Sequence, residues 1–116
     1  MTLPAGRPVT FRDESSTLSS SHDGPAAIEA VRSGAGLRLT AYQGTQRSGG
    51  HAIRIERITR VADELRVHAR FVTPPPGAIV TLALTSPAHT VIVDETAPVV
   101  VLLDTDGVER ARASPR

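Results

Sequence analysis

Three stretches in the middle of the chain alternate apolar and polar residues with a period of two, which is typical of half-buried β-strands. They are residues 37–42, 52–58 and 65–71. A short polar segment, "RVADE", separates the second stretch from the third. Residues 52–71 are therefore predicted to form a β-hairpin with one face in the core and one charged face in solvent.

A pair of glycines, Gly49 and Gly50, stands just before this hairpin and has three interpretations. A phosphate-binding turn would lead into a helix, and the strand-like alternation that follows disfavours it. A turn with positive φ is common for glycine. A bulge or a close backbone approach at the mouth of a strand also needs a residue without a side chain. Within the strand, Ile58 falls out of the alternation set by Ile55, which predicts a β-bulge near Arg57.

The second half of the chain contains further apolar stretches. Residues 78–84, "AIVTLAL", are apolar on both faces and are expected to form a central strand after a rigid loop at residues 73–77, "TPPPG". Residues 90–93, "TVIV", and residues 97–103, "APVVVLL", are expected to form strands as well. Residues 108–116 are interpreted as a short last strand or a loose tail.

Short strands with turn residues between them and little helix predict an all-β fold, either a small antiparallel β-sandwich or a partly closed barrel. The length of 116 residues is enough for one domain. Residues 1–24 are predicted to be a flexible lead, because the serine-rich part buries little apolar surface. Within this lead, "VTF" is a candidate for a short strand. Residues 25–110 are assigned to a single β domain and residues 111–116 to a tail; residues 26–33 fit either a helical turn or a strand.

The composition restricts the kind of core and the kinds of binding or catalytic site that the chain can form. Hydrophobic residues make up 40% of the chain and aromatic residues 3%, so the core must be aliphatic. The absence of cysteine excludes disulfides, thiolate zinc sites and thiol catalysis. The net charge is +1, and the arginines of the hairpin are interrupted by acidic residues and lack aromatic stacking partners. We therefore expect no nucleic-acid partner.

We recognise neither a transmembrane segment nor a signal peptide in the sequence as written. No stretch approaches the roughly 18 apolar residues that cross a bilayer. The first residues, "MTLPAGRPVTF", lack the apolar core and cleavage site of a signal peptide. The sequence as written is expected to be cytoplasmic, or to belong to the cell envelope or be secreted if an export signal has been trimmed. Because residues 97–103 need cover on both faces, a homodimer is a further expectation.

Three short motifs occur in a fixed order with strands between them. They are Gly44 with Ser48-Gly49-Gly50 before a strand of isoleucines, Pro74-Pro75-Pro76-Gly77, and Thr85-Ser86-Pro87 followed by Val91 and Val93. Over residues 37–93 this order resembles the PrcB C-terminal domain family. The sequence departs from the family pattern at Arg47, at His51 and at Ala88, where proline and two aromatic residues are usual.

The resemblance implies a non-catalytic interaction module, because the family is named after a lipoprotein subunit of a secreted protease complex with an assembling or stabilising role. The glycine and proline loops are also similar, more faintly, to the loops of chagasin-type protease inhibitors. We expect a protein partner, either a protease or an envelope protein, to dock on loops gathered at one end of the domain. The predicted contact residues are Arg47, Ser48, Gly49, Gly50, His51, Pro74, Pro75, Pro76, Gly77, Ser86, Pro87 and His89.

Evidence for catalysis is sparse in the sequence. No catalytic motif is present, and no cofactor and no metal are expected, so the chain is predicted not to be an enzyme. The alternative from another class is a small metal-dependent or hydrolytic site around His51 and His89, with Asp94 or Glu95 nearby.

Overall fold

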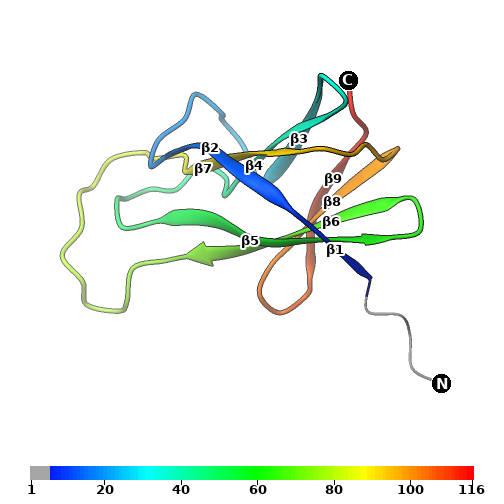
Figure 1. Ribbon diagram of the computed structural model, residues 1–116. Helices are drawn as coiled ribbons and strands as arrows, with labels where there is room; N and C mark the ends of the chain where they lie inside the picture. Colours follow the sequence, from blue (N-terminus) through cyan, green and yellow to red (C-terminus); the bar gives the residue numbers. More distant parts are fainter. Residues whose placement is uncertain (1–5) are drawn as a thin grey trace.

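The computed structural model describes residues 6–116, which form nine β-strands (Figure 1). Residues 1–5, the start of the predicted lead, lie outside the described residues. The strands are β1 (Arg7–Val9), β2 (Phe11–Thr17), β3 (Ala27–Ser33), β4 (Gly36–Tyr42), β5 (Ala52–Val61), β6 (Glu64–Val72), β7 (Ala88–Val93), β8 (Val99–Leu103) and β9 (Glu109–Ala113).

Two sheets pack face to face and make a sandwich. The first sheet has the order β1-β5-β6-β8-β9 and the second the order β2-β7-β4-β3. All neighbouring pairs are antiparallel except β6 and β8, which run parallel. The predicted all-β sandwich is confirmed, and the barrel alternative does not apply because the sheets remain separate.

The core between the sheets is aliphatic, as the composition predicts. Its largest fully buried side chains include leucine, isoleucine and valine from strands of both sheets, namely Leu37, Leu39, Ile58, Leu65, Val67, Val91, Val93, Val100 and Leu102. The two phenylalanines, Phe11 and Phe71, pack at its margin. Each buried leucine or valine contributes about 1.5–3 kcal/mol of transfer free energy, so the alternation seen in the sequence accounts for the packing of the sheets.

The hairpin of β5 and β6 follows the prediction closely. Its register shifts between Ile55 and Arg57, so Glu56 is the extra residue of a β-bulge, as the broken alternation predicts. The turn at Ala62 and Asp63 closes the hairpin, with Ala62 at a φ of 54°. The ambiguous segment 26–33 is strand β3, which pairs along its length with β4.

The N-terminal segment differs from the predicted flexible lead. Residues 7–17 form β1, which pairs with β5, and β2, which pairs with β7 (Figure 1). Burial of side chains does not explain why this segment forms strands, because Val9 is the one buried residue among residues 7–17. Backbone hydrogen bonds to neighbouring strands hold this polar segment in place. Such bonds do not require apolar side chains, so the sequence shows no hydrophobic pattern here.

The C-terminal segment is also more ordered than a tail. Residues 111–113 belong to β9. Beyond them, the backbone N–H of Arg116 donates to Ala30 O, and that of Arg32 donates to Arg116 O, at 3.0 and 2.9 Å. The end of the chain therefore joins the first sheet to β3 of the second.

The prediction of a central strand at residues 78–84 is wrong. These residues lie in a long loop between β6 and β7, and Ile79, Leu82 and Leu84 are exposed. The proline-rich segment before them carries the chain past the end of the sheet, where no second layer covers an apolar segment. Strand β8, by contrast, lies between β6 and β9 with Val100 and Leu102 buried within the chain, so this strand does not require a second copy to cover it.

The part of the chain that the structure describes contains no helix long and apolar enough to cross a membrane.

Candidate functional site

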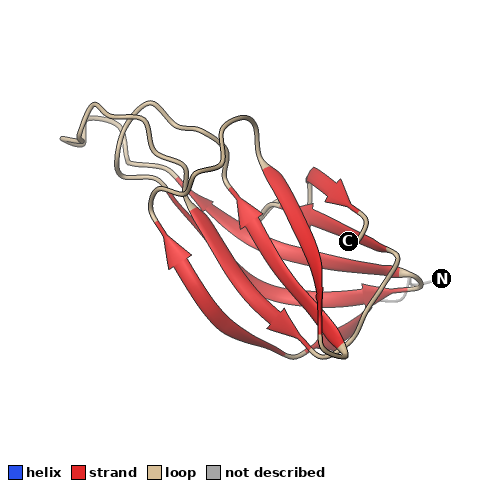
Figure 2. Ribbon diagram, turned by 90° about the horizontal axis from the view of Figure 1, so that it is seen from above, coloured by secondary structure: helices blue, strands red, loops and turns tan. Residues whose placement is uncertain are grey.

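Three loops meet at the end of the sandwich that lies away from both termini (Figure 2). They are the first loop, residues 18–26, the glycine loop, residues 43–51, and the long loop, residues 73–87. We call this region the loop end. It contains the predicted contact residues 47–51, 74–77 and 86–87, whereas His89 lies in β7.

Backbone hydrogen bonds hold the three loops together. Gln46 and Thr85 exchange two N–H to O bonds of 2.8 and 2.9 Å, which join the glycine loop to the long loop. The hydroxyl of Thr85 donates to Ser48 O at 2.8 Å. The N–H of Ser20 in the first loop donates to Ser86 O. These bonds give the loop end a defined shape even though it lies outside both sheets.

The paired glycines have different roles within this contact. Gly50 has a φ of 87°, and a side chain on it would lie 3.0 Å from Pro74 Cβ and 3.1 Å from Val80 Cγ1. Gly49 has room for a methyl group, and its N–H donates to Thr81 O at 2.8 Å. Both the positive-φ and the close-approach interpretations therefore apply at Gly50, whereas strand β5 after the glycines rules out the phosphate-binding turn.

The most exposed large apolar side chains of the described residues lie on the long loop. Ile79, Leu82 and Leu84 have relative exposures of 102%, 90% and 72%. We call residues 78–84 the apolar loop. Sequence reasoning missed it as a surface because an apolar run normally indicates a core strand. The prolines on both sides, at 74–76 and at 87, were the available signal that the run lies outside a sheet.

The predicted contact residues divide into an exposed group and a buried group. Arg47, Gly50 and Pro75 to Gly77 are exposed, and Ser48, Gly49, His51 and Pro74 are half-buried beside them. Ser86, Pro87 and His89 are buried instead, so they lie beneath the surface and support the loops. Strand β7 begins at Ala88, two residues before the predicted start at Thr90, so His89 lies within the strand and its side chain is buried.

His89 makes two hydrogen bonds that define its tautomer. The backbone N–H of Ile55 donates to His89 Nδ1 at 2.8 Å, so Nδ1 carries no proton. His89 Nε2 then donates to Asp13 Oδ1 at 2.9 Å. Both ring nitrogens are therefore occupied, and neither has a free lone pair for a metal ion or a substrate proton.

His51, the second residue of the alternative site, has a buried Nδ1 atom with no hydrogen-bond partner among residues 6–116. Within those residues, no group of three or more His, Asp or Glu side chains is placed so that it could hold a metal ion. Among residues 6–116, these two histidines therefore belong to no cluster of side chains that could hold a metal ion.

The base of the loop end holds one aromatic contact. The rings of His22 in the first loop and Tyr42 in β4 stack with centroids 4.5 Å apart, and His22 Nε2 lies 2.9 Å from Pro25 O. Burial, together with the nearby Glu29 carboxylate, raises the pKa of the Tyr42 hydroxyl. Tyr42 therefore remains a neutral phenol and fixes the first loop against the sheet.

Comparison with known proteins gives one family. The PrcB C-terminal family matches residues 39–94, from the middle of β4 to the residue after β7. The matched segment includes the glycine loop, the β5–β6 hairpin and the whole long loop. Comparison with curated proteins and with solved structures gave no match. The resemblance predicted from the three sequence motifs is thus confirmed by a match to the PrcB C-terminal family over residues 39–94.

Proposed function

We propose that this chain is a non-enzymatic protein-interaction domain that docks onto a subunit of a protease complex through its loop end. The family match supports a domain related to protease complexes. The match spans the glycine loop and the long loop, so the proposed contact surface lies inside the family segment.

The observation that carries the proposal is the apolar loop. Three large aliphatic side chains stand in solvent on a segment whose neighbours are held by backbone hydrogen bonds. Exposed apolar clusters of this kind on a soluble domain mark interaction surfaces. Because the loop is already ordered, a partner with a complementary apolar pocket would bind it without a large entropic cost.

A binding role also agrees better with the polar groups than catalysis does. The buried imidazole of His89 is fully used in joining the two sheets. The exposed residues of the loop end are mainly apolar side chains, prolines and glycines, with Asp23 and Arg47 as charged side chains among them. Such a surface supplies shape and apolar area for a protein contact.

The test compares three proteins for binding to candidate proteases encoded beside this chain in its genome. They are the unmodified chain, the double variant Ile79→Ser with Leu82→Ser, and the control Val108→Ser, which removes an exposed aliphatic side chain from the β8–β9 turn. Each lost leucine or isoleucine contact is worth about 1.5–3 kcal/mol, so the double variant should bind at least about 100-fold more weakly. The control should bind like the unmodified chain.

Protease activity measured in the same mixtures separates a stabilising subunit from a chagasin-like inhibitor. A stabilising subunit should leave peptide hydrolysis intact and slow thermal inactivation of the protease. Loss of hydrolysis at saturation would support the inhibitor alternative. Equal affinities for all three proteins would show that the apolar loop is not the contact surface.

A further inference from the structure

Along half of strand β5, one edge has no neighbouring strand among residues 6–116. Strand β1 pairs with β5 only at Ile58, Thr59 and Arg60. On the other edge, β6 pairs with β5 along its whole length. Residues 52–57 of β5 therefore present an edge that no strand of the described chain occupies.

The hydrogen bond to His89 identifies the backbone groups on this edge. Ile55 donates its N–H to His89 and not to Ala69, its partner in β6, so Ile55 faces away from β6. In an antiparallel ladder this orientation repeats every second residue, so the N–H and C=O of Ile53 face the same way. The edge thus offers a donor and an acceptor at Ile53 and an acceptor at Ile55.

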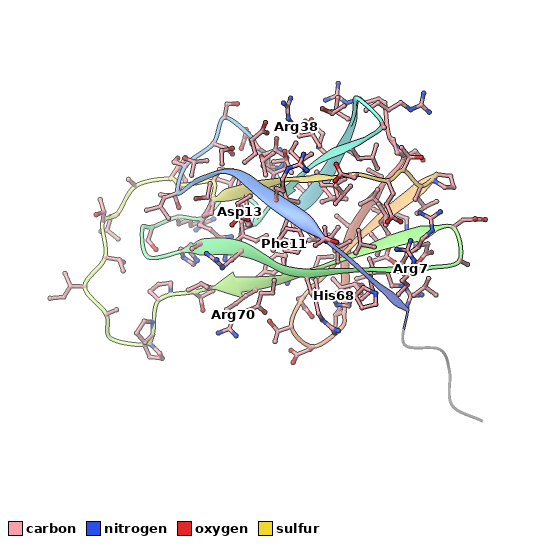
Figure 3. All side chains as sticks on the ribbon, in the orientation of Figure 1. Arg7, Phe11, Asp13, Arg38, His68 and Arg70 are labelled. Atoms are coloured by element: carbon pink, nitrogen blue, oxygen red, sulfur yellow. The ribbon has the colours of Figure 1, made fainter. Side chains whose placement is uncertain are left out.

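A groove lies along this edge. It has a volume of about 560 Å³ and is bordered by residues 13–18 of β2 and its loop, by residues 52–54 of β5, and by Arg70, Val72 and His89. Figure 3 shows Asp13 on β2 and Arg70 on β6, on the two sides of β5. Strand β2 is itself the edge of the second sheet, so the groove lies between the unpaired edges of two strands.

Two cations border the groove, and within the described part of the chain Arg54 is the one without an ion-pair partner. Glu14 pairs with Arg38, Arg70 pairs with Glu56, and Asp13 accepts from His89. Arg54 is exposed at the border of the groove and forms no ion pair with any of residues 6–116. A negatively charged side chain in the groove would therefore be complementary to Arg54.

We infer that the groove between β2 and β5 accepts an extended peptide segment of a protein partner, which pairs with the β5 edge at Ile53 and places an acidic side chain on Arg54. Addition of a strand to an exposed sheet edge draws affinity from main-chain hydrogen bonds and specificity from side-chain contacts. The inference rests on the proposed interaction role, but it concerns a surface separate from the apolar loop.

The test uses synthetic blocked hexapeptides of alternating valine and threonine, added at up to millimolar concentration to the ¹⁵N-labelled chain. One peptide has a central glutamate, a second has lysine in its place, and a third is the glutamate peptide N-methylated at alternate residues so that it cannot donate to a strand edge. The glutamate peptide should shift the amide signals of Ile53 and of residues 13–17. It should bind about tenfold more tightly than the lysine peptide, since hydrogen bonds to charged groups are worth about 1.5 kcal/mol or more.

Two charge variants complete the design. Arg54→Glu should reverse the preference between the glutamate and lysine peptides. The control Arg57→Glu makes the same change on the same strand outside the groove and should keep the original preference. The inference is overturned if the groove amides do not shift, if the N-methylated peptide binds equally well, or if the shifts depend on protein concentration alone, which would assign the groove to a second copy. Because the double variant Ile79→Ser with Leu82→Ser should bind these peptides normally, failure here leaves the loop-end proposal separately testable.

Discussion

The imidazole of His89 on β7 accepts a hydrogen bond from the backbone N–H of Ile55 on β5, and this 2.8 Å contact joins the two sheets through the core. The bond forms on an edge of β5 where no strand of the described chain pairs with it. A side chain of one sheet thus satisfies an edge donor of the other, and unsatisfied buried donors are otherwise costly.

Replacement of His89 tests this contact. His89→Leu removes the acceptor and should lower the free energy of unfolding by about 2–3 kcal/mol, because the Ile55 N–H stays buried without a partner. His89→Asn places an oxygen near the position of Nδ1 and should retain the bond. The distinguishing measurement is hydrogen exchange of the Ile55 amide, which should become faster in the leucine variant and stay slow in the asparagine variant. Equal exchange in the unmodified chain and in His89→Leu would refute the contact.

The paired glycines allow a matched comparison one residue apart. Gly50→Ala should destabilise the chain by about 1–2 kcal/mol, because alanine resists a positive φ and its methyl group would press on Pro74 and Val80. Gly49→Ala adds the same methyl group where the nearest atom, Thr81 Cβ, is 3.6 Å away, and should cost little. Urea unfolding measures both values. The Gly50→Ala variant should also show faster proteolysis within the long loop, since the bonds between Gln46 and Thr85 depend on this packing. Similar losses in the two variants would contradict the assigned contact.

The sequence predicted the parts of the fold where side-chain burial decides the structure. Alternation located β4, β5 and β6, and the broken alternation at Ile58 located the bulge at Glu56. The motifs around Gly50 and Pro74 correctly indicated segments that meet at one end of the domain. In these places each residue's environment repeats with the strand period, so the pattern can be read directly.

Other elements of the fold have no such periodic pattern in the sequence. Strand β2 carries mostly exposed polar residues and is held by backbone pairing with β7. The segment around Leu82 is as apolar as a core strand, yet it lies in solvent. The role of His89 depends on a residue 34 positions away in the chain. Such features follow from the relative placement of the sheets, which local composition does not encode.

The end of the sandwich opposite the loop end is stabilised by one shared carboxylate, and its titration gives a pH prediction. Glu95 accepts from Arg7 at 2.6 Å and from Arg60 at 3.1 Å, and so ties β1 and β5 to the β7–β8 connection. The hydrogen bond from Arg7, opposed by partial burial and reinforced by Arg60, lowers the pKa of Glu95. The unfolded chain, where the pKa of Glu95 is higher, then binds the proton more readily than the folded chain does.

The stabilisation from Glu95 is therefore complete above its unfolded pKa and is lost as the pH falls through the lower folded value. Glu95→Gln should reduce the free energy of unfolding by about 1 kcal/mol at neutral pH, the sum expected for two surface ion pairs, and by much less in acid. The control Asp106→Asn changes a carboxylate whose side chain makes no hydrogen bond or ion pair with any other described residue. Urea unfolding from pH 7 to pH 3 should show the curves of the unmodified chain and Glu95→Gln converging, while the control stays parallel to the unmodified chain. A constant gap for Glu95→Gln across this range would mean that packing, and not charge, holds this end of the sandwich together.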